Sequence, residues 1–185
     1  MIKIGLSHID IITVVSKEDT EDFECLYNGG LPGHTLINPT RLQVKEMLEA
    51  HTYRPLLIFG HGDERGLYDK DYGYLIGAKE IPLLRQRSCI IGVWCYASNF
   101  ADHYDLKGFF TSMFISNMEE AIIHQVDRGA TPEKIKEENI KFAKNLKKAI
   151  IEKQPIENWA KTFQDGADIS LPFVRFNYEA LSYFD

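Results

Sequence analysis

The stretch Leu-Leu-Ile-Phe-Gly-His-Gly at residues 56–62 is an apolar run that ends abruptly in small and polar residues. A second run of the same kind, Ile-Ile-Gly-Val-Trp-Cys-Tyr-Ala-Ser, occupies residues 90–98. Short aliphatic runs followed immediately by a loop are typical of buried strands in a parallel sheet. We therefore predict two buried strands, of which one ends just before His61 and the other just before Cys95.

His61 and Cys95 are the main candidate functional residues. In open α/β sheets, ligands and catalytic groups gather at the carboxyl ends of the strands, where loops surround a crevice. If the two strands are neighbours, the imidazole and the thiol lie on the same rim, which is the arrangement of a nucleophile with its base. Either residue alone is more often structural, His61 as a partner of loop carbonyls and Cys95 as a small core residue.

The composition is that of one globular domain spanning residues 1–185, with 44% hydrophobic and 26% charged residues. No apolar run approaches the roughly 20 residues of a membrane-spanning helix, and residues 1–10 show no secretory signal. The cysteines, Cys25, Cys89 and Cys95, lack the spacing of a disulfide framework. A net charge of −6 argues against general binding to nucleic acids or acidic membranes. We expect a cytoplasmic protein.

The rest of the chain alternates between predicted strands and helices. Strands are predicted at residues 9–15, 34–37, 89–94 and 108–115, with a small hairpin at 66–75 and a final edge strand at 173–178. Helices are predicted at residues 40–51, 80–87, 118–127 and 131–153 and from Pro155 onward, and a further helix after Cys95 has Ser98 or Asn99 as its predicted cap. Residues 17–24 are interpreted as a surface loop. The aromatic tail at 181–184 is interpreted as packed core or, alternatively, as a docking strip for a partner.

These features together resemble the caspase-like (clan CD) cysteine peptidases. The shared features are the His-Gly run at 57–62, the hairpin after it, the Cys-containing run at 90–98 and Leu-Lys-Gly-Phe-Phe at 106–110, in this order. The similarity covers residues 9–127 and is closest to the bacterial branches related to clostripain, gingipain, separase and the CHAT domains. It implies an α/β, caspase-like three-layer sandwich with a mostly parallel central sheet and helices on both faces.

The resemblance also implies the chemistry of a cysteine endopeptidase. Such an enzyme cleaves a peptide bond in a protein or peptide substrate and needs no cofactor and no metal. By this analogy His61 is the acid and base, Cys95 is the nucleophile, and the backbone N–H groups of Gly62 and Cys95 form the oxyanion hole. Donors aimed at the developing oxyanion contribute on the order of 3 kcal/mol each, and glycine permits the close backbone approach that they need.

Substrate-binding residues are expected from the same analogy. Ser116 and Asn117 correspond to the strand that pairs with substrate, and Asp63 and Glu64 are candidates for the other wall of the cleft. The caspase signature Gln-Ala-Cys-x-Gly is absent, so specificity for aspartate is not implied. The position two residues before the nucleophile helps to select the residue before the scissile bond (P1). Here it is Val93, which puts specificity for basic residues in doubt.

Three other interpretations stay open. A non-catalytic caspase-like module would recruit a regulatory protein partner through its cleft or its aromatic tail. An unrelated doubly wound hydrolase or binding protein would share the sheet, although the chain has no Gly-x-x-x-x-Gly-Lys phosphate loop. A zinc site made of His61, Cys89, Cys95 and His103 is disfavoured, because the sequence has no Cys-x-x-Cys or His-x-x-x-His pair and Cys89 lies at the opposite strand end.

Overall fold

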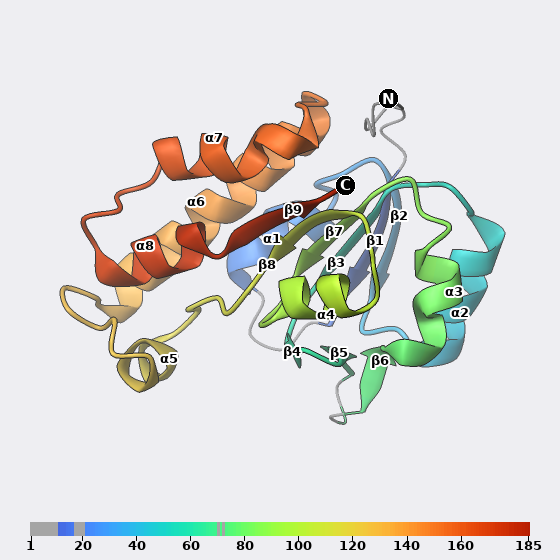
Figure 1. Cartoon of the computed structure of the whole chain (residues 1–185), viewed down its shortest axis with the longest axis horizontal. Coiled ribbons are helices and arrows are strands. Elements are labelled where there is room, and N and C mark those ends of the chain that lie inside the picture. The colour runs from blue at the N-terminus through green and yellow to red at the C-terminus, as the bar shows by residue number, and fades with distance from the viewer. Residues whose placement is uncertain (1–10, 17–20, 70, 72) are drawn as a thin grey trace.

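A parallel sheet forms the centre of the molecule. The computed structural model describes residues 11–16, 21–69, 71 and 73–185. The six-stranded sheet has the order β2-β1-β3-β7-β8-β9 (Figure 1). Its strands are β1 (Ile11–Val15), β2 (Gly33–Ile37), β3 (Leu56–Phe59), β7 (Ile90–Val93), β8 (Gly108–Thr111) and β9 (Leu181–Phe184). Neighbouring strands are parallel except β9, which runs antiparallel to β8. The predicted α/β class with a mostly parallel central sheet is confirmed.

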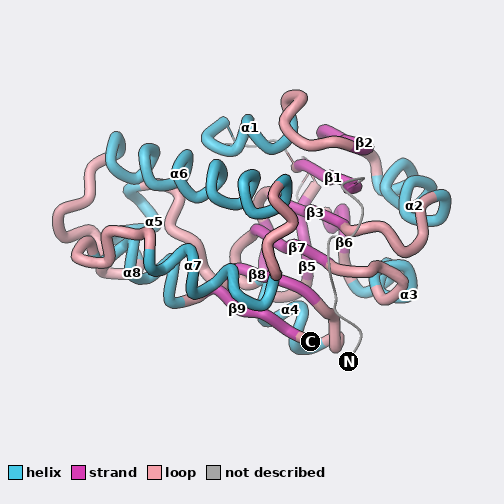
Figure 2. Tube along the Cα trace, turned by 90° about the horizontal axis from the view of Figure 1, so that it is seen from above, coloured by secondary structure: helices cyan, strands magenta, loops and turns pink. Residues whose placement is uncertain are grey.

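Helices cover both faces of this sheet (Figure 2). One face packs against α1 (Glu24–Tyr27), α6 (Pro132–Ile151), α7 (Trp159–Asp165) and α8 (Pro172–Glu179). The other face packs against α2 (Arg41–Ala50), α3 (Ile81–Leu84) and α4 (Ala97–His103). The remaining described helices are α5 (Met118–Ile123) and the 3-10 helices η1 (Glu21–Phe23), η2 (Ala78–Glu80) and η3 (Ile156–Asn158). No helix in the described part of the chain combines the length and the apolar character that crossing a membrane requires.

Each central strand is apolar along its whole length because both of its faces are covered. Successive side chains of a strand point to opposite faces. In β3, Leu57 and Phe59 pack on the side of α6, whereas Leu56 and Ile58 pack on the side of α2. All four side chains are at most 1% exposed. This burial on two sides explains why the runs that form β3 and β7 show no polar alternation.

Two helices begin directly after residues 40 and 131, the first residues of their predicted ranges. Thr40 caps α2, and Thr40 and Gln43 each accept a hydrogen bond from the backbone N–H of the other. Thr131 caps α6, with Pro132 in the first turn of the helix. The predicted strand, helix and strand at residues 34–59 are present as β2, α2 and β3, and β1 lies between the two strands in the sheet.

The segment predicted as a final edge strand, residues 173–178, is instead the helix α8. Pro172 lies in its first turn, and the buried residues have the spacing of one helical face: Phe173, Val174, Asn177 and Tyr178. The edge strand is β9, which the aromatic tail forms by pairing with β8. The interpretation of the tail as packed structure is therefore confirmed, and the strand prediction before it is wrong.

Two further predictions fail at the ends of elements. Residues 21–24 are not a surface loop, because η1 and α1 begin there and Phe23 is only 7% exposed. The strand predicted to reach residue 115 ends at Thr111, and the chain then runs along the α6 side of the sheet. The predictions for residues 9–10 and 17–20 lie outside the described residues.

A small antiparallel sheet follows β3 directly. It consists of β4 (Gly62–Asp63), β5 (Gly66–Tyr68) and β6 (Tyr74–Ile76), so the predicted hairpin at 66–75 is confirmed and gains a third strand. The Asp63 carboxylate accepts hydrogen bonds from Arg65, Tyr68 and Tyr74 at 2.7, 2.9 and 2.9 Å. These bonds tie all three strands together beside the carboxyl ends of β3 and β7.

Candidate active site

His61 and Cys95 lie at equivalent positions beyond two neighbouring strands. In the register of β3 and β7, Phe59 is opposite Val93, and Gly60 donates its N–H to the Val93 carbonyl at 3.2 Å. His61 lies two residues after Phe59, and Cys95 lies two residues after Val93. Because adjacent strands are only about 4.8 Å apart, the register sets the imidazole and the thiol on the same rim of the sheet.

A small pocket of about 40 Å³, open to solvent, lies at this rim. It brings together four of the residues singled out in the sequence, namely His61, Val93, Cys95 and Ser116. Its other lining residues are Phe23, Phe59, Gly60, Trp94 and Phe114. The pocket is therefore a largely aromatic depression with a thiol and an imidazole at its edge.

Gly60 sets the direction in which the chain leaves β3. Its φ of +146° is one that residues with a side chain rarely adopt, and a Cβ atom there would lie 2.7 Å from the carbonyl oxygen of Ser16. Ser16 follows β1 directly and donates its N–H to the carbonyl of Phe59 at 3.1 Å. The close approach of these two strand ends requires glycine immediately before His61.

A strained turn carries Cys95 from β7 into α4. Tyr96 is the N-cap of α4 and has a left-handed backbone with φ 64°, so the predicted caps Ser98 and Asn99 lie inside the helix instead. A non-glycine residue in this conformation costs on the order of 1–3 kcal/mol and persists where the surroundings enforce it. Here the Trp94 carbonyl accepts hydrogen bonds from the Ala97 N–H at 3.2 Å and from the buried Thr111 hydroxyl at 2.9 Å.

Replacing Thr111 by valine is expected to lower the free energy of unfolding by about 1 kcal/mol, because the Trp94 carbonyl loses one of its two donors. Thr13→Val is the matched control. Both threonines are at most 1% exposed, but the Thr13 hydroxyl has no hydrogen-bond partner among the described residues. Thr13→Val should therefore leave stability unchanged or raise it. Urea unfolding measures both, and equal losses in the two variants would contradict the role of Thr111.

The Cys95 thiol is half-buried and neutral in the resting protein. Burial and, to a smaller extent, the negative charge of Glu120 together raise its pKa to about 11, although the contact with the Phe114 backbone lowers it in part. Its sulfur lies 3.9 Å from the carbonyl oxygen of Phe114. Within the described residues, no hydrogen bond joins this sulfur to the His61 ring. Catalytic hydrogen bonds often tighten only when substrate is bound, so the arrangement has the parts of a dyad but holds no preformed thiolate.

Residues 114–116 pass beside the thiol and are held by side chains rather than by a strand. The Asn177 carboxamide accepts the N–H of Ile115 at 2.7 Å and donates to its carbonyl at 3.0 Å. The Glu120 carboxylate accepts the N–H and the hydroxyl of Ser116 at 2.6 and 2.9 Å, and Asn139 donates to the Ser116 carbonyl at 3.2 Å. The backbone of Ser116, expected to pair with substrate, is thus already engaged.

Three of the expected cleft residues lie outside the pocket. Asn117 caps α5 by accepting the Glu120 N–H at 2.9 Å. Glu64 is exposed in the turn between β4 and β5. The Asp63 carboxylate is occupied inside the small sheet, where burial alone would raise its pKa but hydrogen bonds from Arg65 and two tyrosines hold the pKa below its usual value. These contacts give Asn117 and Asp63 structural roles.

Gly62 is required by packing. A Cβ atom there would lie 2.4 Å from both the Gly66 carbonyl oxygen and the Trp94 ring. Tyr68 donates its N–H to the His61 carbonyl at 2.8 Å. Because hydrogen-bonded and non-bonded pairs alternate along an antiparallel ladder, Gly62 occupies a non-bonded position and its N–H faces away from β5.

Sequence analysis missed the residues that complete this site. Phe23, an isolated aromatic residue in an acidic segment, lines the pocket, and so does Phe114, which falls within the strand predicted at 108–115. Glu120 carries one weak signal, its position four residues after Ser116, which allows a contact at the start of a helix. Asn177 is a polar residue among apolar neighbours at helical spacing, which signals a buried hydrogen bond once the helix is recognised.

The chain was compared with known proteins. No protein-family model matches it, and no curated protein is significantly similar to it. In the part that the structure describes, no group of three or more His, Cys, Asp or Glu side chains is arranged to hold a metal ion. The assignment of a function therefore rests on the geometry of the pocket and on the resemblance in the quoted residues.

Proposed function

We propose that the protein is a caspase-like cysteine endopeptidase in which Cys95 is the nucleophile and His61 is the acid and base. The observation that carries the proposal is the register of β3 and β7, which sets both residues on the rim of one pocket. The strained turn at Tyr96 supports it, because backbone strain clusters at functional sites. The substrate is an extended segment of another protein.

In the proposed reaction, the Cys95 sulfur attacks the carbonyl carbon of the scissile bond while the thiol proton passes to the His61 imidazole. The oxyanion is stabilised by the backbone N–H groups of Cys95 and Gly62, at on the order of 3 kcal/mol each. The imidazolium then gives its proton to the departing amine, which leaves a thioester on Cys95. Water, deprotonated by His61, hydrolyses the thioester and restores the thiol.

Because the pKa of Cys95 is raised, we infer that its proton is transferred only once substrate is bound. A thiol with a pKa of about 11 holds its proton throughout the neutral range. His61 then acts as a general base during the attack, rather than as the partner of a thiolate that exists beforehand. Substrate that fills the aromatic pocket excludes water and brings the carbonyl carbon to the sulfur, so that attack and deprotonation are coupled.

A second candidate function is a non-catalytic caspase-like module that binds a partner through the same pocket. The neutral thiol favours this alternative, because nucleophilic cysteines in other enzymes commonly have a lowered pKa. In a binding module, Cys95 and Phe114 would simply be lining residues. The two functions differ in whether the chain turns over peptide bonds.

Digestion of a proteome-derived peptide library tests the proposal. The wild-type chain should generate new amine termini, Cys95→Ala should generate none above background, and His61→Ala should reduce the rate about 10²–10⁴-fold. Cys25→Ala and His103→Ala are matched controls outside the pocket and should retain the wild-type rate. Cleavage that survives in Cys95→Ala would refute the dyad, and a folded wild-type chain without any cleavage would favour the binding module.

A further inference from the structure

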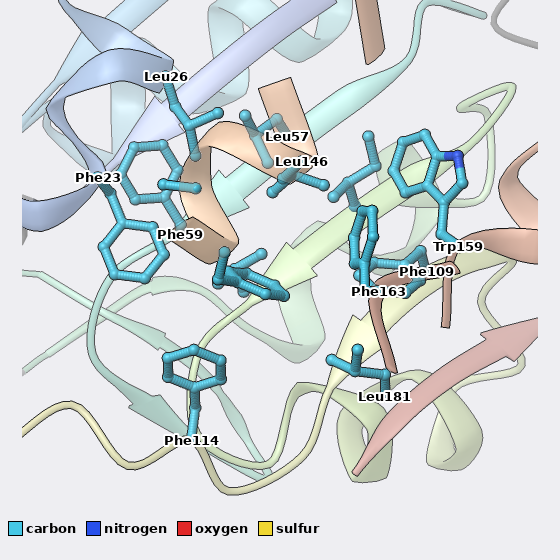
Figure 3. Packing of buried hydrophobic residues seen from close by; sticks show 14 of the residues in the cluster. Phe23, Leu26, Leu57, Phe59, Phe109, Phe114, Leu146, Trp159, Phe163 and Leu181 are labelled. Atoms are coloured by element: carbon cyan, nitrogen blue, oxygen red, sulfur yellow. The ribbon is translucent and has the colours of Figure 1, made fainter. Parts of the chain in front are cut away.

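The pocket beside the dyad has an aromatic wall built from three separate parts of the chain. Phe23 comes from η1, Phe59 from the end of β3, and Phe114 from the segment after β8 (Figure 3). The Phe23 ring centroid lies 6.0 Å from that of Phe59 and 6.2 Å from that of Phe114. Phe142 of α6 backs this wall, with its ring centroid 5.0 Å from that of Phe114. The wall is thus part of the core on the α6 side of the sheet.

Among the described lining residues the titratable groups are His61 and Cys95, and the Glu120 carboxylate lies beyond Ser116. Val93 lies two residues before Cys95 and is 5% exposed, and Trp94 is 2% exposed. None of the described lining residues is Asp, Glu, Lys or Arg. Ser116 is the lining hydroxyl, and its Oγ already bonds to Glu120. A lysine, arginine or aspartate side chain that entered would lose its hydration among apolar side chains, and the nearby Glu120 carboxylate is already bonded to the Ser116 N–H and hydroxyl.

The pocket also has the position of a site for the side chain next to the attacked carbonyl. Its lining includes both Cys95 and His61, so a carbonyl carbon within reach of the Cys95 sulfur carries its own side chain at the mouth of the pocket. That side chain belongs to the P1 residue. An unbranched or γ-branched aliphatic chain can follow the space between fixed rings better than a bulky planar ring can.

We propose that the aromatic pocket binds the side chain of the P1 residue, and we call it the P1 site. It selects an aliphatic side chain of the size of leucine or methionine. This inference rests on the proposed peptidase function and adds the class of substrate. Val93, Phe114 and Phe23 are the specificity-determining residues. The enzyme would cleave after an apolar residue that is exposed in an extended segment, and acidic and basic P1 residues would be poor substrates.

Peptidyl acyloxymethyl ketones that differ only at P1 test the inference with the full-length chain. The rate of adduct formation on Cys95 is followed by intact mass and peptide mapping for P1 leucine, methionine, phenylalanine, aspartate and arginine. Leucine and methionine probes should label Cys95 about 100-fold faster than the charged probes. Phe114→Leu should raise the rate for phenylalanine relative to leucine, whereas Phe176→Leu, a half-buried phenylalanine of α8 that packs against His124 and does not line the pocket, should leave the ratio unchanged.

A charge placed in the wall provides a second test. Val93→Asp should increase the rate for the arginine probe and reduce the rate for the leucine probe. If wild-type Cys95 is labelled faster by a charged probe, or equally by all probes, the apolar P1 site is refuted while the dyad stands. If no probe labels Cys95 in the folded chain although the denatured chain is alkylated there, both the P1 site and the proposed peptidase are refuted.

Discussion

Cys95 is expected to react with iodoacetamide about 100 times more slowly at neutral pH than an unperturbed cysteine. Its pKa is raised to about 11, first by burial and then by the charge of Glu120. Against an ordinary value of 9.0, the thiolate fraction of Cys95 falls by about two decades. Since the thiolate is the reacting species, the alkylation rate should rise about tenfold per pH unit up to about pH 11. Peptide mapping by mass spectrometry follows Cys95 separately from Cys25 and Cys89.

Glu120→Gln isolates the electrostatic part of this effect. Removing the carboxylate charge should move the alkylation profile of Cys95 to lower pH, and glutamine can still accept the Ser116 N–H. Glu119→Gln, an exposed neighbour on the same helix, is the matched control and should leave the profile in place. A wild-type inflection below pH 8 that disappears in His61→Ala would instead show a preformed thiolate and imidazolium pair, and the general-base scheme would have to be abandoned.

Asn177→Leu is expected to lower the free energy of unfolding by about 2–4 kcal/mol. The leucine side chain has a similar volume but cannot bond to the N–H and carbonyl of Ile115, and each buried backbone group left without a partner costs about 1–3 kcal/mol. Denaturant unfolding measures the loss. Asn158→Leu replaces an exposed asparagine whose side chain forms no cap bond to α7, and should change stability by less than about 0.5 kcal/mol.

The same variant should also loosen the site. Ile115 lies between Phe114, whose carbonyl faces the Cys95 sulfur, and Ser116, which lines the pocket. Without the Asn177 carboxamide, residues 114–116 lose their fixed position, and Cys95 becomes more exposed to solvent. Iodoacetamide should therefore label Cys95 faster in Asn177→Leu than in the wild type. An unchanged labelling rate together with lowered stability would separate Asn177 from the site and restrict it to a structural role.

Local patterns in the sequence were sufficient where a residue's role depends on its immediate neighbours. The β3 and β7 runs are apolar throughout because both faces of the sheet are covered, and this pattern can be recognised within seven to nine consecutive residues. Thr40 and Thr131 are recognisable as caps because capping involves the next three residues. The neighbourhood of His61 and Cys95 followed from the single assumption that the two strands are adjacent, and the register meets that assumption.

Prediction failed where the answer depends on distant parts of the chain. In residues 173–178, the alternation of Val174, Phe176 and Tyr178 with polar residues suits a strand. The buried residues have helical spacing instead, and packing against α6 decides between the two. The pocket wall draws on three remote segments. The pKa of the Cys95 thiol depends on its burial and on the charge of Glu120, and no local sequence pattern encodes either of these.

The position of Trp94 gives the molecule an internal optical reporter. The chain contains two tryptophans, and they lie in the cores on opposite faces of the sheet. Trp94 lines the pocket next to Cys95 and donates its indole N–H to the Asp63 carbonyl at 3.1 Å, whereas Trp159 is fully buried against Phe109 and Phe163. In a Trp159→Phe chain, the emission spectrum would arise from Trp94 alone. Occupancy of the pocket could then be followed in real time by fluorescence, without any attached label.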